Sequence, residues 1–262
     1  MTMNAILTNT MKTNAQILNL KHLHPHGVEG FHSLPCVYGG KAVPETPALR
    51  GMALCHVTLP PNGETRLTPE EKGHYHRQMT ELYCFTAGSG RMRLNGAWRA
   101  VQGGTVVLVP PMVMHTVAAN GKGVEFIVVT VPAYRHEDSF DLFDCPPEFS
   151  RNDPAWAKEL PITEPTRPRE ITELFSTNEW ELAVVRLAPG AAIPSHRHEA
   201  EEEAYFIIEG SATVTLAGRT TRVEPGAFVS IPPGTEHSIA AGPRCARYYV
   251  AANPPVAVRV EV

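Results

Sequence analysis

The stretch HRHEAEEEAYFIIEG, residues 196–210, decides the fold because it has a counterpart in HYHRQMTELYCFTAG, residues 74–88, which lies 122 positions earlier (196 minus 74). Identical residues recur at this spacing from the first histidine to the last. They form the pairs His74/His196, His76/His198, Glu81/Glu203, Gly88/Gly210, Gly104/Gly226, Pro110/Pro232, Pro111/Pro233 and His115/His237. Since no insertion or deletion interrupts this series, we predict a duplicated domain that carries a duplicated site.

The bulk composition is that of a globular protein with a core: 262 residues, of which 43% are hydrophobic and 19% charged. This length suits one large domain or two domains of about 100 to 130 residues each. A net charge of −4 and a pI near 6.3 argue against a nucleic-acid backbone or an anionic membrane as the main partner. No apolar run reaches the roughly 18 to 20 residues of a transmembrane helix.

The N-terminal sequence has no continuous apolar region and no small-residue cleavage site, so we expect no secretory signal and a cytoplasmic location. The five cysteines are odd in number and form no C-x-x-C motif. We therefore expect reduced thiols.

Short runs rich in β-branched and aromatic residues, separated by glycine and proline, predict an all-β fold. Asn95-Gly96 is a strong signal for a two-residue hairpin, and Ala217-Gly218 takes its place in the second copy. The pattern is typical of an antiparallel sandwich or barrel. The expected strands include 52–59, 81–88, 91–94, 97–101, 124–132, 180–187 and 244–254.

Changes in composition divide the chain into an N-terminal arm (1–45), an N-terminal barrel (46–143), a proline-rich connector (144–170) and a C-terminal barrel (171–262). The arm contains His22, His24 and His26, which we interpret as part of a surface segment rather than a third metal site. Such an arm could pair with a sheet edge or with a second subunit. Residues 171–175 are expected to add a helical turn.

Each H-x-H pair suits a metal site, because residues i and i+2 of a strand point to the same face. A turn must separate the pair from its glutamate, and a Pro-Pro turn can deliver the last histidine from a more distant strand. Among the glutamates at 199 and 201–203, only Glu203 keeps both the spacing from Glu81 and the interval to the next glycine. The predicted ligands are His74, His76, Glu81 and His115 in the first copy and His196, His198, Glu203 and His237 in the second.

A lone histidine is more often a core residue than a ligand, but six of the twelve histidines fall on these two constellations. Their spacings resemble the cupin superfamily, whose motifs are G-x5-H-x-H-x3–4-E-x6-G and G-x5-P-x-G-x2-H-x3-N. The second copy departs from these motifs only at Ala241, where the family usually has Asn. The first departs at Thr68, Met112 and Ala119, none of which is a ligand, and Met112 replaces the glycine of the turn before His115.

The resemblance implies an all-β fold of two tandem cupin (double-stranded β-helix, jelly-roll) barrels, with a 3-His-1-Glu metal site in each. The architecture is similar to that of quercetinases and oxalate decarboxylases. Three imidazoles and a carboxylate leave two adjacent positions of an octahedral ion open, which suits Fe(II) or Mn(II), with Ni, Co or Zn as alternatives and up to two ions per chain. Because the second copy keeps more of the motif, we expect the chemistry there, with Glu203 and Tyr205 as candidate catalytic residues.

Three functional hypotheses remain open, all with a small molecule as the partner, and for the two enzyme hypotheses this molecule is an oxygen-rich organic substrate. The first is a non-haem metal dioxygenase or related oxidoreductase, and it is ranked ahead of the others. The second is a redox-neutral isomerase, lyase or decarboxylase. The third is a non-catalytic binding module. The chain is expected to act as a monomer or a homodimer, without nucleic acid or membrane as a partner.

Overall fold

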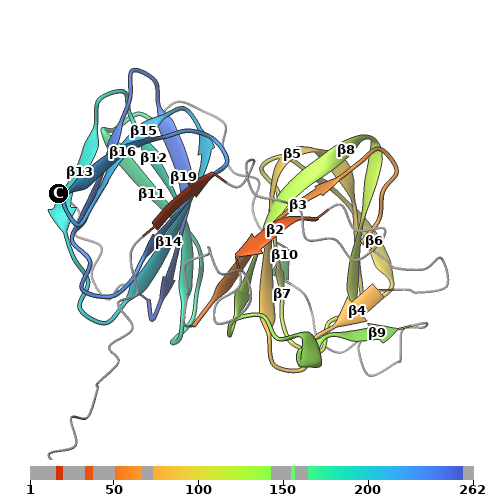
Figure 1. Cartoon of the computed structure of the whole chain (residues 1–262). Coiled ribbons are helices and arrows are strands. Elements are labelled where there is room, and N and C mark those ends of the chain that lie inside the picture. Colours follow the sequence, from red (N-terminus) through yellow and green to blue (C-terminus); the bar gives the residue numbers. More distant parts are fainter. Residues whose placement is uncertain are drawn as a thin grey trace, which may run out of the picture.

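The computed structural model describes residues 16–19, 33–37, 51–65, 73–142, 155–156 and 165–255. These residues form β-strands and one short 3-10 helix, η2 (His136–Asp138). The strands build two barrels side by side (Figure 1). The predicted all-β, two-barrel architecture is confirmed. Within the described residues no helix is long and apolar enough to cross a membrane.

The N-terminal barrel is one continuous nine-stranded sheet, because its two longest strands run through both of its walls. The expected strands 81–88 and 91–94 are a single strand, β5, which bends at register shifts beside Gly88 and Gly90. Gly88 has φ +71°, a backbone conformation that favours glycine. The strands are β3 (Ala53–Leu59), β4 (Gly73–Tyr75), β5 (Thr80–Leu94), β6 (Ala97–Gln102), β7 (Val106–Val109), β8 (His115–Val131) and β9 (Phe140–Leu142).

The C-terminal barrel has a six-stranded and a four-stranded sheet. Its strands are β11 (Arg169–Ser176), β12 (Glu181–Leu187), β13 (Ala192–His196), β14 (Glu202–Glu209), β15 (Ala212–Leu216), β16 (Arg219–Val223), β17 (Ala227–Ile231), β18 (His237–Ala241) and β19 (Ala246–Asn253). The prediction of a helical turn at residues 171–175 was wrong. This segment lies in β11, which pairs with β12 along its whole length, so the ladder overrides a weak local preference.

Segments outside the repeats add strands to both barrels. β1 (Gln16–Asn19) pairs with β17 of the C-terminal barrel, and β2 (Ser33–Val37) pairs with β3 of the N-terminal barrel. The expected pairing of the arm with sheet edges is therefore confirmed, whereas His22, His24 and His26 lie outside the described residues. β10 (Ala155–Trp156), in the predicted connector, pairs with β7. The boundaries between the four segments stay a prediction.

The cysteines differ from the expectation of reduced thiols. Cys84 and Cys245 are buried thiols, but Cys55 is disulfide-bonded. Cys36 lies directly opposite Cys55 in the β2–β3 ladder. Cross-strand neighbours in an antiparallel pair lie within the Cα separation that a disulfide requires. The expectation was wrong for Cys55 because sequence spacing alone does not show which cysteines face each other.

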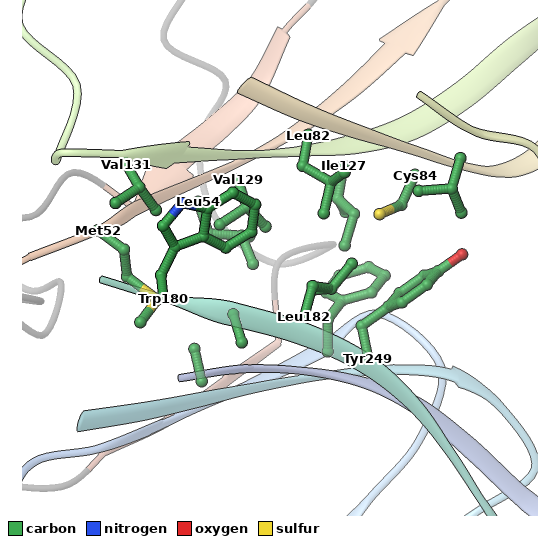
Figure 2. Packing of buried hydrophobic residues seen from close by; sticks show 14 of the residues in the cluster. Met52, Leu54, Leu82, Cys84, Ile127, Val129, Val131, Trp180, Leu182 and Tyr249 are labelled. Carbon is green, nitrogen blue, oxygen red and sulfur yellow. The ribbon is translucent and has the colours of Figure 1, made fainter. Parts of the chain in front are cut away.

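Two apolar cores fill the barrels, and a third joins them. This joining core lies between the nine-stranded sheet of the N-terminal barrel and the six-stranded sheet of the C-terminal barrel. The first sheet contributes Leu54, Leu82 and Ile127, and the second contributes Leu182 and Tyr249 (Figure 2). Several of its residues occupy equivalent positions in the two repeats, since Ile127 and Tyr249 are 122 positions apart. The two barrels thus bury the same face against each other, and the predicted metal-ligand residues are not part of this joining core.

Candidate metal centres

The N-terminal centre brings together all four predicted residues of the first copy. The ligand atoms of His74, His76, Glu81 and His115 all lie within 4.8 Å of one another. β4 supplies His74, β5 supplies Glu81 and the start of β8 supplies His115, which pairs directly with His74. Glu81 Oε1 lies 3.3 Å from His76 Nε2, and Glu81 Oε2 lies 2.7 Å from His115 Nε2.

The C-terminal centre repeats this arrangement with His196, His198, Glu203 and His237, again within 4.8 Å. His196 and His237 are paired across β13 and β18. Glu203 Oε1 lies 3.5 Å from His198 Nε2, and Glu203 Oε2 lies 3.1 Å from His237 Nε2. Each of the eight residues predicted from the sequence as a metal ligand therefore lies in one of two clusters with suitable donor atoms.

Backbone carbonyls orient several of the imidazoles. The Nδ1 atom of His115 lies 2.9 Å from the Val113 carbonyl, and that of His237 lies 2.9 Å from the Thr235 carbonyl. His196 Nδ1 is similarly placed, 2.8 Å from the Pro194 carbonyl. Because a carbonyl only accepts, Nδ1 must carry the proton, and in the neutral rings of His115 and His237 the Nε2 lone pair then faces the glutamate.

This arrangement fits a cation at each centre. The Nε2 atoms of His76, His115, His198 and His237 are buried and make no hydrogen bond with suitable geometry, although carboxylate oxygens lie close to them. Nitrogen and carboxylate lone pairs that face each other repel unless a positive charge lies among them. A divalent metal ion supplies that charge and accepts all four donors, which are the donors typical of transition-metal sites.

The protonation behaviour of the two glutamates agrees with this view. Burial alone would raise the pKa of Glu81, but His76 and His115 hold that pKa well below its usual range. Burial also opposes ionisation of Glu203, yet its interactions with His237 and His198 lower its pKa. Both carboxylates are therefore held in the ionised form that binds metals.

A tyrosine hydroxyl supports each glutamate. Tyr83 donates a hydrogen bond of 3.0 Å to Glu81 Oε2, and Tyr205 donates one of 2.9 Å to Glu203 Oε2. Burial, together with the adjacent carboxylate, raises the pKa of both phenols well above the usual range, so each remains a donor. The Tyr205 hydroxyl, predicted as catalytic, thus contacts the candidate ligand Glu203.

The turn before the last histidine is the same in the two centres, despite the departure of the first copy from the cupin motif. Met112 has φ +64° and Gly234, its counterpart, has φ +76°. The Met112 amide donates to the His76 carbonyl at 2.7 Å, and the Gly234 amide donates to the His198 carbonyl at 2.6 Å. A methionine thus adopts the left-handed conformation of the family glycine, at a cost of roughly 1–2 kcal/mol.

The centres differ in what surrounds them. The His76 side chain is 2% exposed, whereas that of His198 is 18% exposed. At the N-terminal centre His76 Nδ1 donates a hydrogen bond of 2.8 Å to the backbone carbonyl of Asp138. Sequence reasoning missed Asp138, because a backbone carbonyl acceptor leaves no signature in residue type.

Comparisons with known proteins agree with this geometry. The family model described as "Cupin domain" matches residues 183–250, and that described as "AraC-like ligand binding domain" matches residues 60–159. A 74-residue segment is 34% identical to an uncharacterized protein of Methanocaldococcus jannaschii; the match spans 26% of this chain and 59% of that relative.

Solved structures align with nearly the whole chain at low sequence identity. A variant of the oxalate decarboxylase of Bacillus subtilis aligns with 93% of this chain and 78% of its own, at 17% identity and a TM-score of 0.63. The Lactobacillus farciminis oxalate decarboxylase formate complex aligns with 91% of this chain and 86% of its own, at 17% identity and a TM-score of 0.64. Protein Ylba of E. coli aligns with 95% of this chain and 94% of its own, at 16% identity and a TM-score of 0.66.

At these identities the structural likeness shows the fold. Together with the family match and the two clusters, it defines the class: this chain is a two-domain cupin, a bicupin, with two candidate 3-His-1-Glu metal sites.

Proposed function

We propose that this bicupin is a metal-dependent enzyme that acts on a small, oxygen-rich organic substrate at its C-terminal centre. The observation that carries the proposal is the convergence of three imidazoles and one ionised carboxylate, with buried Nε2 atoms that no protein donor satisfies. The more exposed His198 supports assigning the chemistry to this centre. At the other centre, the AraC-like ligand binding match supports a binding role.

His196, His198, Glu203 and His237 would hold the ion, with Fe(II) or Mn(II) favoured by the donor set and Ni, Co or Zn as alternatives. Such an ion supplies Lewis-acid polarisation of a substrate oxygen, or a coordination position for O2. Glu203 contributes the negative charge. Tyr205 keeps the Glu203 carboxylate oriented through its hydrogen bond, and its high pKa keeps the donated proton in place.

We place a redox-neutral reaction first, as a lyase, decarboxylase or isomerase. The sequence alone ranked dioxygenase-type chemistry ahead, but several of the similar structures are oxalate decarboxylases, and one of these is described with Mn(II) centres. Support for the alternative, a non-haem dioxygenase, comes from the donor set. Four protein ligands on an octahedral ion leave two positions, enough for a substrate and O2 together.

Metal analysis followed by a substrate screen tests the proposal. Purified protein should contain close to two transition-metal ions per chain, one for each cluster. Oxalate, 2-oxo acids, diketones, catechols and a flavonol are then supplied to Mn(II)- and Fe(II)-loaded protein, with O2 uptake and products measured. Product without O2 uptake supports the redox-neutral reaction, whereas stoichiometric O2 uptake supports the dioxygenase. Protein that binds no metal overturns both, and metal-loaded protein that binds but never converts these compounds indicates a binding module.

A further inference from the structure

The segment that follows β8 folds back over the N-terminal centre. We call residues 132–142 the cover; it contains η2 and β9. β9 pairs with β4, which places Asp141 opposite His74 and Phe140 opposite Tyr75. The rings of Phe140 and Tyr75 stack with centroids 5.2 Å apart, and the Arg77 guanidinium lies 4.2 Å from the centre of the Phe140 ring. Figure 1 shows β4 and β9 together at one end of the barrel.

Asp138 connects the cover to the ligands. Its carboxylate accepts hydrogen bonds from the backbone amides of Arg77 (2.9 Å), Gln78 (3.0 Å) and Met79 (2.9 Å). Its carbonyl accepts the Nδ1 proton of His76. One buried residue therefore fixes both the ring of one ligand and the loop that joins His76 to Glu81.

These bonds restrict the movement that release of a metal requires. His76 can leave the centre only if its ring rotates or the loop 77–79 shifts. Ring rotation breaks the bond to the Asp138 carbonyl, and a shift of the loop breaks the three amide bonds to its carboxylate. Hydrogen bonds that orient a metal ligand commonly change metal affinity by about 10- to 100-fold.

The corresponding loop of the C-terminal centre has no such clamp within the described residues. There, no hydrogen bond joins His198 Nδ1 to another described residue. The neighbouring Arg197 and Glu199 are 64% and 76% exposed and pair with each other at 2.8 Å. The two centres thus share their donors but differ in how firmly the second histidine is held.

We propose that Asp138 is a positioning residue that makes the N-terminal centre a slowly exchanging metal site, while the C-terminal centre exchanges its metal rapidly. The proposal rests on metal binding at both centres, but it does not depend on which reaction the protein catalyses.

Release of Zn(II) from the fully loaded protein to 4-(2-pyridylazo)resorcinol, followed by absorbance, tests the proposal. Wild-type protein should release its zinc in two phases of equal amplitude, with rates that differ roughly 10-fold or more. His198→Ala should remove the fast phase and His76→Ala the slow one. Asp138→Asn, which keeps the shape but weakens the acceptor, should accelerate the slow phase by about 10-fold or more and leave the fast phase unchanged.

Glu137→Gln is the matched control, because Glu137 is an exposed carboxylate in the same 3-10 turn. It should leave both phases unchanged. Phe140→Ala loosens the cover without changing Asp138 or a ligand, and it should accelerate only the slow phase. This second variant tests the proposal even if the Asp138 variant folds poorly.

A single release phase in the wild type overturns the proposal, as does an Asp138→Asn variant that alters both phases equally or neither. Protein that takes up no zinc under any condition refutes metal binding itself, and so fails the proposed function as well.

Discussion

The N-terminal and C-terminal centres use the same two residue types at the same spacing, but the first lies beneath the cover, whereas the second is more exposed among the residues that the structure describes. His76 is bonded to Asp138 and nearly inaccessible, whereas His198 is partly exposed and its loop consists of solvated residues. Duplication thus preserved the donors, and the surroundings diverged. An accessible centre suits turnover of a substrate, while an enclosed one suits retention of an ion.

The largest effect is expected from removal of the carboxylate ligand. Glu203→Gln should reduce turnover on the order of 100-fold or more, because the buried site loses the negative charge that balances the metal. Glu81→Gln, the matched change, should reduce turnover by less than about 10-fold and remove one bound ion per chain. Steady-state kinetics and metal content check both variants. An inactive Glu81→Gln protein beside an active Glu203→Gln protein would reverse the assignment of the two centres.

Metal removal should reduce the free energy of unfolding. An ion present at a hundred times its dissociation constant adds about 2.7 kcal/mol per site, provided that the unfolded chain does not bind it. Urea denaturation with Mn(II), and after exhaustive chelation, measures the difference. If the cover retains its ion as proposed, brief chelation should remove only the C-terminal contribution. Identical urea midpoints with and without the ion would contradict metal binding at either centre.

A smaller effect is expected at a position where the C-terminal barrel has a tyrosine and the N-terminal barrel has a phenylalanine. Tyr248 is fully buried inside the C-terminal barrel with its hydroxyl unpartnered among the described residues, and its counterpart in the N-terminal barrel is Phe126. A buried polar group without a partner costs about 1–3 kcal/mol. Tyr248→Phe should therefore stabilise the protein and Phe126→Tyr should destabilise it, each by an amount in this range. Thermal unfolding distinguishes this result from a hydroxyl that makes a favourable contact, in which case Tyr248→Phe would lower the melting temperature.

The smallest effect concerns the equivalent hairpin turns. Asn95 (φ 45°) and Ala217 (φ 46°) both have left-handed backbones, and the Asn95 side chain also accepts a hydrogen bond of 3.0 Å from the Met114 amide. Ala217 has no side-chain oxygen for the equivalent amide of Glu236. Ala217→Asn should raise the free energy of unfolding by about 1 kcal/mol and Asn95→Ala should lower it by a similar amount. If neither variant changes the urea midpoint, the side chain at these two turn positions does not affect stability.

Much of the fold could be predicted because the chain repeats itself. The 122-residue spacing selected Glu203 from four neighbouring glutamates, and all eight predicted ligand residues lie in the two clusters. Strand positions followed from runs of β-branched residues between turns. The prediction failed where long-range pairing decides local structure, as in β11, whose register against β12 is not visible in residues 171–175.

The surroundings of the centres were the less predictable part. The carbonyl acceptors of Asp138, Val113 and Thr235 belong to the backbone, and any residue type supplies one. Asp138 also lies 62 residues after His76, so its role depends on how the cover folds back. The disulfide at Cys55 escaped prediction for the same reason, since facing residues are set by ladder register.

The position of β1 has a consequence for synthesis of the chain. Gln16 pairs with Ser230, which is 214 residues later (230 minus 16). At a translation rate of about 5–20 residues per second, residues 16–19 leave the ribosome roughly 10 to 40 s before their partner strand is made. The N-terminal barrel can gather its own strands in that interval, but the C-terminal sheet must recover an edge strand from a part of the chain that was made much earlier. Completion of the second barrel is therefore necessarily a late, long-range event, and the arm must remain accessible until it occurs.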